Sequence, residues 1–282
     1  MPTRVSGPDE LFFLGSGGGR IHVAIQYIST AGLIFRFNGT QAHVDPGPGT
    51  MVRMRQHRVN PRLTSLVLVT HQHTDHCHDA PVVVEAMREN MKVKKGTLVT
   101  TKDYATNFPA FYRDLLKDIH GLDPGESVVH RGAKITATKT VHGDTPGVGF
   151  KINVPTGAGK DGNQPYVVGF SGDTEMFDGF SEQFADVDLL VLNLLRPDDV
   201  HCDRHACTAE VIPHVSEIKP KYLIITHFGA RMLSDWHPKS NVPRQVKKIQ
   251  EATGVPTAAA QDGRGFRIRR LLPEVKAPRP RA

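Results

Sequence analysis

The stretch Thr70-His71-Gln72-His73-Thr74-Asp75-His76 places three imidazoles and one carboxylate within six residues. It follows the apolar run Leu66-Val67-Leu68-Val69, which has no polar alternation and therefore predicts a strand buried on both faces. The histidines then lie in the loop at the carboxyl end of that strand, where open α/β sheets place their functional sites. Burying so many polar rings without a cation would leave donors and acceptors unmatched, so the pattern predicts a metal site.

The spacing within this motif suits two metal ions instead of one. In an extended loop, the alternate residues His71 and His73 can point the same way and share one ion. Asp75 and His76 lie on the turn into the next predicted helix, so they can serve a second ion beside the first. Donor sets of His and Asp accept zinc, manganese, iron or cobalt. We therefore expect two divalent metal ions, with zinc as the first choice and manganese or iron as alternatives.

Three more predicted strands are followed by a side chain that can bind a metal. These side chains are His142, Asp173 and His227, after the predicted strands at 135–141, 166–171 and 222–226. The end of the first of these strands should fall on the same sheet edge as His71, which makes His142 a candidate third ligand for the first metal. The Asp173 carboxylate can bridge two cations with one oxygen to each, which holds two metals about 3.5–4 Å apart.

Composition favours one large α/β domain with anionic partners. The chain has 282 residues, 39% of them hydrophobic, and no linker divides it, so we expect one domain over residues 1–272 and a disordered tail at 273–282. The formal net charge of +6 comes from dispersed Lys and Arg, with clusters at 92–95, 244–248 and 264–270. Such clusters favour anionic partners, although each also fits an ordinary solvated face.

The cysteines and the apolar segments of the sequence indicate the cellular compartment in which the protein is expected. The first ten residues contain no apolar signal segment, and no window approaches about 18 uninterrupted apolar residues. Cys77, Cys202 and Cys207 form no C-x-x-C pair, so we expect a reduced, cytoplasmic protein with no membrane partner. Cys77, beside the metal motif, is either a soft metal neighbour or an inert buried thiol. Cys202 and His205 lack the further ligands of a structural zinc site.

A glycine-rich segment, Gly15–Arg20, follows the predicted strand at 11–14. A dinucleotide-binding loop would need a third glycine at position 20, which is Arg, and a helix after it. Residues 21–27 instead alternate like a strand. We therefore exclude a dinucleotide site and expect a flexible glycine loop that borders the metal site.

A hairpin is predicted at residues 32–37 and 41–44, across the turn signal Asn38-Gly39. Its second arm ends at Asp45, in a turn rich in Pro and Gly. Two interpretations of Asp45 stay open. It is either an outer-sphere partner that holds a metal-bound imidazole, or a turn-forming residue.

The remaining segments predict further helices and strands. Helices are expected at 80–90, 105–119, 208–218 (with Thr208 as N-cap) and 242–253. Strands are expected at 97–101, 149–154, 188–195 and 265–272. The glycine-rich stretch at 156–163 is expected to form a surface loop.

The ordered series His71-x-His73-x-Asp75-His76, His142, Asp173 and His227 resembles the metallo-β-lactamase fold hydrolases over most of the chain. The resemblance implies an αββα sandwich, in which two mixed β-sheets are flanked by helices and the metals lie at one edge. It assigns one metal to His71, His73 and His142, and the other to Asp75, His76 and His227, with Asp173 as the bridge. All seven residues are present, which favours a catalytic member of the family.

Within this superfamily, three further stretches resemble ribonuclease Z and related phosphodiesterases. Residues 14–19 resemble their opening strand and glycine loop, and Thr226–Arg231 resembles their last motif. His205-Ala206-Cys207-Thr208-Ala209-Glu210 is similar to their H-S-T-A-E segment. The histidine of that segment contacts the scissile phosphate in this group, which implies the same role for His205.

The chain departs from the tRNA-processing members in one respect. Those enzymes carry a long arm between their third and fourth motifs, whereas 30 residues separate His142 from Asp173 here. These residues suffice for two strands and a tight loop, so the tRNA arm cannot be accommodated. Either tRNA binds without the arm, or the substrate is a smaller phosphodiester, which we favour.

These features predict a dinuclear hydrolase in which metal coordination activates a water molecule for attack on a phosphodiester. Asp75 would position the nucleophile, and His205 would stabilise or protonate the leaving side. We expect an anionic substrate, with RNA as one candidate, and a homodimer. A lactone or thioester hydrolase and an iron-dependent oxidoreductase of the same fold stay open. The intact ligand set disfavours a non-catalytic nucleic-acid-binding role.

Overall fold

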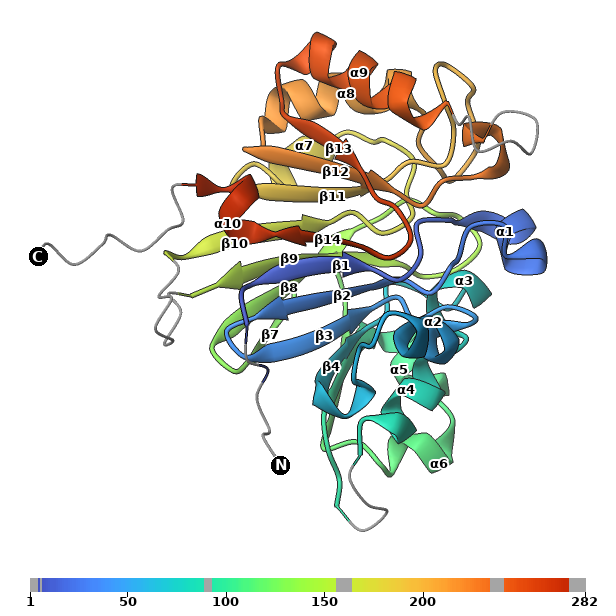
Figure 1. The fold of residues 1–282 in the computed structure, drawn as a ribbon, viewed down its shortest axis with the longest axis vertical. Helices are drawn as coiled ribbons and strands as arrows, with labels where there is room; N and C mark the ends of the chain where they lie inside the picture. The colour runs from blue at the N-terminus through green and yellow to red at the C-terminus, as the bar shows by residue number, and fades with distance from the viewer. Residues whose placement is uncertain (1–4, 6, 89–92, 156–163, 234–240, 274–282) are drawn as a thin grey trace, which may run out of the picture.

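The computed structural model of the chain describes residue 5 and residues 7–88, 93–155, 164–233 and 241–273. Two β-sheets pack face to face, and helices cover the outer face of each sheet (Figure 1). Both sheets are mixed, so the predicted αββα sandwich is confirmed. Over the residues described, the helices are all too short or too polar to span a lipid bilayer.

The first sheet has the strand order β14-β1-β2-β3-β4-β5-β6. Its strands are β1 (Glu10–Phe13), β2 (Leu33–Phe37), β3 (Thr40–Val44), β4 (Thr64–Leu68), β5 (Thr97–Thr101), β6 (Asp118–Leu122) and β14 (Arg264–Arg267). Strands β14, β1, β2 and β3 pair antiparallel, whereas β3, β4, β5 and β6 pair in parallel. The parallel half directs the carboxyl ends of β4 and β5 to the same edge.

The second sheet has the order β13-β12-β11-β10-β9-β8-β7. Its strands are β7 (Ser127–His130), β8 (Ala133–Lys139), β9 (Val148–Val154), β10 (Tyr166–Phe170), β11 (Leu189–Asn193), β12 (Tyr222–Thr226) and β13 (Thr257–Ala259). Strands β7 to β10 pair antiparallel, and β10 to β13 pair in parallel. Strands β10 and β12 therefore end on the same side.

Helices form the two outer layers (Figure 1). Those over the first sheet are α2 (Thr50–Gln56), α4 (Ala80–Ala86), α5 (Lys102–Asn107) and α6 (Ala110–Arg113). Those over the second sheet are α7 (Phe180–Gln183), α8 (Thr208–Ile218) and α9 (Val242–Thr253). Three short helices lie at the ends of strands: α1 (Gly19–Ile25), α3 (Thr74–Cys77) and α10 (Ile268–Leu271). Single 3₁₀ turns occur at Pro61–Leu63 and Ala230–Met232.

The apolar run before the histidine motif is buried on both faces, as predicted. Leu66 and Leu68 of β4 belong to the core between the two sheets, whereas Val67 and Val69 pack under α4 and α5. All four side chains are fully buried. Each such side chain contributes about 1.5–3 kcal/mol of stability relative to the exposed state, so β4 is firmly anchored and fixes the loop that follows.

The predicted hairpin is present as β2 and β3, with Leu33 opposite Val44. Asn38 and Gly39 form its turn with φ values of +44° and +74°. Asn and Gly adopt this left-handed conformation at low cost, which explains why the dipeptide marks the turn.

Residues 21–27 were predicted to continue as a strand, and this prediction is wrong, because they belong largely to helix α1. A strand needs a partner for its backbone, and β1 already pairs with β14 on one side and β2 on the other. The segment therefore closes its hydrogen bonds locally, at the end of the sheet. Both neighbours of β1 are antiparallel, so the parallel βαβ unit of a dinucleotide site is still absent here.

Two other segments differ from prediction. Residues 105–119 form α5, α6 and the start of β6 instead of helices alone, because Pro109 has no N–H to continue a helix and β6 pairs with β5. Residues 265–272 form β14 and then α10, because β14 has partners only as far as Glu10, the first residue of β1.

The start of α8 corrects one cap assignment. The N-cap is Cys207, not Thr208, and the Cys207 N–H donates to the Glu210 carboxylate at 2.9 Å. Glu210, at the third position of the helix, thus accepts the N–H of the N-cap residue, as the Glu of a capping box does. Predictions for residues 89–92, the loop at 156–163 and the tail at 274–282 fall outside the described residues.

Candidate metal centre

The seven predicted ligands come from five separate segments that meet at one edge of the sandwich. His71 and His73 follow β4, and Asp75 and His76 lie on α3. The other three follow β8, β10 and β12, and they are His142, Asp173 and His227. Their ligand atoms form two groups, each within 4.8 Å: His71, His73 and His142, and Asp75, His76, Asp173 and His227.

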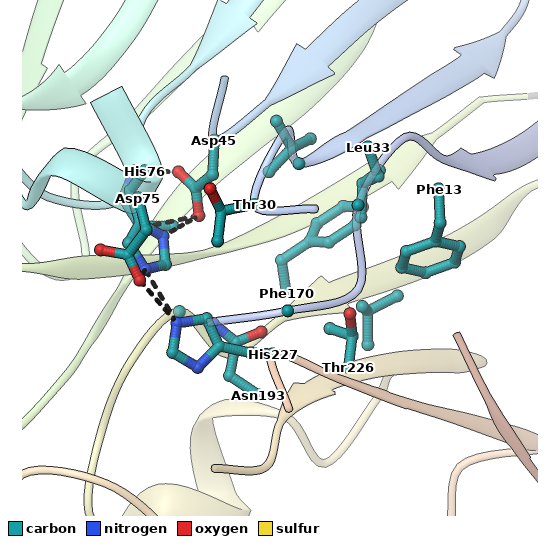
Figure 2. Close-up of a pocket in the computed structure, with 17 residues that line it drawn as sticks. Phe13, Thr30, Leu33, Asp45, Asp75, His76, Phe170, Asn193, Thr226 and His227 are labelled. Atoms are coloured by element: carbon teal, nitrogen blue, oxygen red, sulfur yellow. Dashed lines mark hydrogen bonds and ion pairs between the residues drawn. The ribbon is translucent and has the colours of Figure 1, made fainter. Parts of the chain in front are cut away.

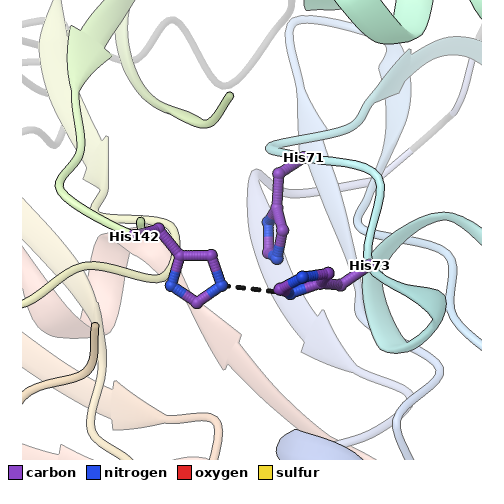
Figure 3. Close-up of side chains that lie close together, drawn as sticks. All are labelled: His71, His73 and His142. Carbon is purple, nitrogen blue, oxygen red and sulfur yellow. Dashed lines mark hydrogen bonds between the residues drawn. The ribbon is translucent and has the colours of Figure 1, made fainter. Parts of the chain in front are cut away.

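The first group consists of three imidazoles that face one another (Figure 3). Nε2 of His142 lies 3.0 Å from Nδ1 of His73. The His71 ring lies 4.6 Å from the His73 ring and 4.7 Å from the His142 ring, between centroids. Three ring nitrogens thus converge on one point, which suits a single cation.

The second group combines two imidazoles with two carboxylates. Nε2 of His76 and Nε2 of His227 lie 3.1 Å apart, and each is 3.2 Å from Oδ2 of Asp173. Oδ2 of Asp75 lies 3.3 Å from Nε2 of His227, and a dashed line marks this contact in Figure 2. The same Asp173 oxygen is 4.0 Å from Nε2 of His71 in the first group. Asp173 therefore stands between the two groups.

The outward nitrogens of three of these rings have hydrogen-bond partners. Nδ1 of His76 lies 2.9 Å from Oδ2 of Asp45, and Nδ1 of His142 lies 2.9 Å from the Arg204 carbonyl oxygen. Nδ1 of His71 is 3.1 Å from Oγ1 of Thr70. Such partners fix the ring orientation and leave Nε2 free to face the centre, which is the usual arrangement around a protein-bound metal.

The glycine loop borders the site, as predicted, and two of its four glycines, Gly18 and Gly19, contact the predicted ligands. The Gly19 N–H donates to Oδ2 of Asp75 at 2.7 Å, which orients that carboxylate. A β-carbon at Gly18 would overlap the His227 ring. Only glycine at position 18 therefore lets the loop approach the cluster this closely.

Two residues of the site hold unusual backbone conformations. The φ of Asp45 is +50° and that of His227 is +61°, both in the left-handed region. Such conformations cost about 1–3 kcal/mol and persist where the surrounding structure enforces them. Here they turn the chain sharply at the end of β3 and of β12, and so aim both side chains at His76.

Burial and opposite charges set the protonation of the cluster. Burial opposes charge on His76, but Asp173, Asp75 and Asp45 outweigh it and raise the pKa of His76 well above its ordinary value. Burial likewise opposes charge on Asp173, but His227 and His76 hold the pKa of that carboxyl well below its usual range. In contrast, burial and the neighbouring His76 lower the pKa of His71 well below 6.5.

The donor set fits divalent cations. Nε2 of His71 is fully buried and has no hydrogen-bond partner, although it faces the other two rings of its group. Such an atom is unfavourable in a protein interior unless a ligand takes it up. Imidazole nitrogens and carboxylate oxygens are also the donors that zinc and other transition metals prefer.

His205 lies beside the cluster, next to Asp173 and His142. Its Nδ1 is 3.7 Å from Oδ2 of Asp173, and its ring centroid is 4.9 Å from that of His142. Its side chain is 18% exposed, so it can reach a molecule in the cleft. Burial lowers the pKa of His205 to about 4. His205, His142 and Asp173 also form a third group of potential ligands.

Several contacts around the site escaped prediction. Nδ2 of Asn193 donates to Oδ1 of Asp173 at 2.7 Å, and Asp144 lies 3.3 Å from Nε2 of His73. Asn193 ends a buried strand and Asp144 closely follows His142, so position alone could have suggested both. No such signal exists for Arg204, which pairs with Asp144 at 2.6 Å.

The cysteines are not among the potential metal ligands of the described residues. Cys77 is half-buried, and its thiol donates to the carbonyl oxygen of Gln72 at 3.2 Å. Burial raises the pKa of Cys77, which keeps it a thiol at neutral pH.

A cleft opens over the cluster, with a volume of about 670 Å³. His73, Asp75, His142, Asp173 and His205 line one part of it. The rest is formed by the start of α1, the segment after β11 and residues 202–204, and three arginines, Arg20, Arg196 and Arg204, face it. The volume lies within the range of about 300–1,000 Å³ that is typical of small-molecule sites.

Comparison with known proteins agrees with this geometry. The profile of the beta-lactamase superfamily domain matches residues 40–228, which include all seven predicted ligands. An uncharacterised protein of Methanocaldococcus jannaschii is 29% identical over 90% of this chain and 93% of its own length. The ribonuclease Z of Methanosarcina acetivorans is 24% identical over 86% and 93% of the two chains, respectively.

Solved structures show the same fold. The metallo-β-lactamase fold protein YhfI of Bacillus subtilis superposes with a TM-score of 0.72 at 17% identity, over 92% of this chain and 99% of that one. The match to the family profile covers more than half of the chain. The chain therefore belongs to the β-lactamase superfamily, as a hydrolase of the metallo-β-lactamase fold.

Proposed function

We propose that this protein is a dinuclear metal-dependent phosphodiesterase that acts on nucleic acid or a small phosphodiester. The observation that carries the proposal is the pair of ligand groups joined by Asp173, at the base of a cleft that three arginines line. A phosphodiester is an anion, and arginine is well suited to recognise phosphate oxygens. The relatedness to ribonuclease Z supports the same class of substrate.

In this proposal, His71, His73 and His142 hold one metal, and Asp75, His76 and His227 hold the other, with Asp173 shared. Bound divalent cations supply Lewis acidity and lower the pKa of water towards neutrality. The outer partners Asp45, Thr70 and the Arg204 carbonyl keep the rings oriented. Asn193 holds the free oxygen of Asp173, so the shared carboxylate cannot rotate easily.

Asp75 and His205 are the candidate catalytic residues. The Gly19 N–H fixes one Asp75 oxygen, and neighbouring His76 and His227 outweigh burial and lower the pKa of Asp75, so it stays ionised and can accept a hydrogen bond from the attacking water. His205 lines the cleft on the Asp173 side, where it can donate a hydrogen bond to the phosphoryl or leaving oxygen. Donors aimed at developing charge typically lower a barrier by about 3–4 kcal/mol.

The segment between His142 and Asp173 favours a substrate smaller than tRNA. Strands β9 and β10 both lie in this segment and pair antiparallel with Tyr166 opposite Val154, so the segment supplies two neighbouring strands of the second sheet. A protruding arm of the kind expected in tRNA-processing relatives has no room in the sequence.

The cytoplasmic location and the homodimer stay predictions.

One assay tests the proposal. The zinc-, manganese- or iron-loaded protein is offered a bis-aryl phosphodiester, a cyclic nucleotide, precursor tRNA, a lactone and a thioester side by side. We expect phosphodiester hydrolysis that disappears on chelation and returns with metal. Hydrolysis of the lactone or thioester alone would refute the phosphodiesterase assignment, and oxygen consumption by the iron form would favour an oxidoreductase.

A further inference from the structure

The cleft is larger than one phosphodiester group requires. Its volume of about 670 Å³ suits a nucleotide-sized ligand. The predicted metal ligands line only part of it, and the rest extends over Arg20 of α1 and over Arg196, after β11. A substrate bound at the cluster therefore has a second portion that faces these arginines.

The three cleft arginines differ in their partners. Arg204 is paired with Asp144 at 2.6 Å. Nη2 of Arg196 has only the Cys202 sulfur, at 3.8 Å, and its Nε is fully buried with no hydrogen-bond partner. Arg20 is exposed and makes no hydrogen bond or ion pair with the residues that the structure describes. Arg20 and Arg196 are thus cations without a carboxylate partner in this part of the chain.

The other acidic residues of the cleft are already engaged. Asp144 lies between Arg204 and His73, and Asp203 pairs with His201 at 3.2 Å. A guanidinium stays protonated at all ordinary pH values, and a thiol is a weak acceptor for it. The guanidinium of Arg196 therefore has no carboxylate acceptor among the described residues, and an anionic ligand in the cleft would supply one.

Arg20 and Arg196 each follow one residue of a contacting pair, Gly19 and Leu195. A β-carbon added at Gly19 would lie 3.4 Å from Cδ1 of Leu195, so the residue before Arg20 packs against the side chain of the residue before Arg196. Both side chains line the same cleft. They can therefore act on one group of the ligand.

We propose that Arg196 and Arg20 form a subsite for a second phosphate, which is not cleaved. The inference rests on the proposed phosphodiesterase function and narrows its substrate class. The substrate is a nucleotide or oligonucleotide in which another phosphate flanks the scissile one. The planar guanidinium of Arg196 can bind two phosphate oxygens at once.

Equilibrium binding tests the subsite without catalysis. Calorimetry compares thymidine 3′,5′-bisphosphate with thymidine 5′-monophosphate on the zinc-loaded protein. We expect the bisphosphate to bind about 10- to 100-fold more tightly, which is the effect of one charged hydrogen-bonded pair. Equal affinities for the two nucleotides would overturn the proposal.

Matched variants assign the preference to the two arginines. Arg196→Gln should remove most of the preference for the bisphosphate, and Arg196→Lys should keep part of it, because lysine retains charge but not the planar fork. Arg20→Gln, at an exposed position, should reduce the preference without a risk to folding. Arg55→Gln removes an exposed arginine of α2 outside the cleft and should leave the preference unchanged. A preference that survives in both Arg196→Gln and Arg20→Gln would overturn the proposal.

Kinetics separate this proposal from the proposed function. The p-nitrophenyl ester of thymidine 5′-phosphate is compared with the same ester that carries a 3′-phosphate. We expect kcat/KM to favour the 3′-phosphorylated ester in the native protein, and Arg196→Gln to lower that ratio. If neither ester is hydrolysed, the phosphodiesterase function fails, whereas the binding ratio of the two nucleotides still decides the subsite.

Discussion

Oδ2 of Asp45 lies 2.9 Å from Nδ1 of His76, and Oδ1 of Asp45 accepts the Thr70 N–H at 2.7 Å. One carboxylate thus joins the end of β3 to the first residue of the histidine motif and to the buried ring on α3. Of the two interpretations of Asp45, the contacts favour the outer-sphere partner, although its φ of +50° also makes it a turn residue.

Asp45→Ala should weaken metal binding by about 10- to 100-fold, because His76 loses the partner that orients its ring. Competition with a chromophoric chelator measures this affinity, and circular dichroism should show little change in helix content. Asp123→Ala, which removes an exposed carboxylate paired with Lys102, is the control and should keep the native affinity. An unchanged affinity in Asp45→Ala would make Asp45 only a turn residue.

Asp173→Asn should lower metal content below two ions per chain and abolish hydrolysis, since the shared carboxylate stands between the two ligand groups. Elemental analysis and turnover on a phosphodiester measure the two effects. The matched change Asp186→Asn, on an exposed ion pair with Lys151, should leave both intact. Two retained metals with full turnover would show that Asp173 is no bridge.

His205→Ala should lower kcat about 10²- to 10⁴-fold on a phosphodiester with a poor leaving group, the range for a positioned acid or donor. Metal content should persist, because His205 lies outside the seven predicted ligands. An activated aryl leaving group needs less assistance, so its loss should be smaller. Loss of metal would instead make His205 a ligand, consistent with its proximity to His142 and Asp173.

His43 should make the protein less stable in mild acid. It is fully buried, its Nε2–H donates to the Ala31 carbonyl at 3.0 Å, and burial lowers its pKa to about 4. As pH falls from about 6.5 towards 4, the unfolded chain takes up a proton at this position and the folded chain does not. The free energy of unfolding should therefore fall by about 1.4 kcal/mol per pH unit from this residue.

Urea unfolding of the metal-free protein at several pH values measures this effect, since metal release then contributes nothing. Above about pH 6.5 both states are neutral at His43, so its contribution is flat there. In His43→Gln, the free energy of unfolding should fall less steeply with decreasing pH below this value, by about 1.4 kcal/mol per pH unit. Equal slopes in the two proteins would place the acid sensitivity elsewhere.

Much of the fold follows from local sequence. The run before Thr70 is apolar at every position, so it predicts a strand buried on both faces, and β4 has that burial. The Asn38-Gly39 turn is equally local, because its backbone conformation suits these two residues. Three segments that were mispredicted, residues 21–27, 105–119 and 265–272, depend instead on whether a neighbouring strand is free to pair.

The identities of the candidate ligands are also readable from sequence, because each follows a strand whose end lies at one edge. The residues that hydrogen-bond to these ligands and orient them cannot be read from the sequence. Gly19 and Asp75 follow β1 and β4 of the first sheet, and His142 and Arg204 follow β8 and β11 of the second. Gly19 meets Asp75, and the Arg204 carbonyl meets His142, because each sheet brings the ends of non-consecutive strands to one edge. Such contacts join residues far apart in sequence, and no local pattern encodes them. The sequence by itself thus determined most of the strands and the donor types, whereas packing decided the orientation of each ring and which arginines lack a partner.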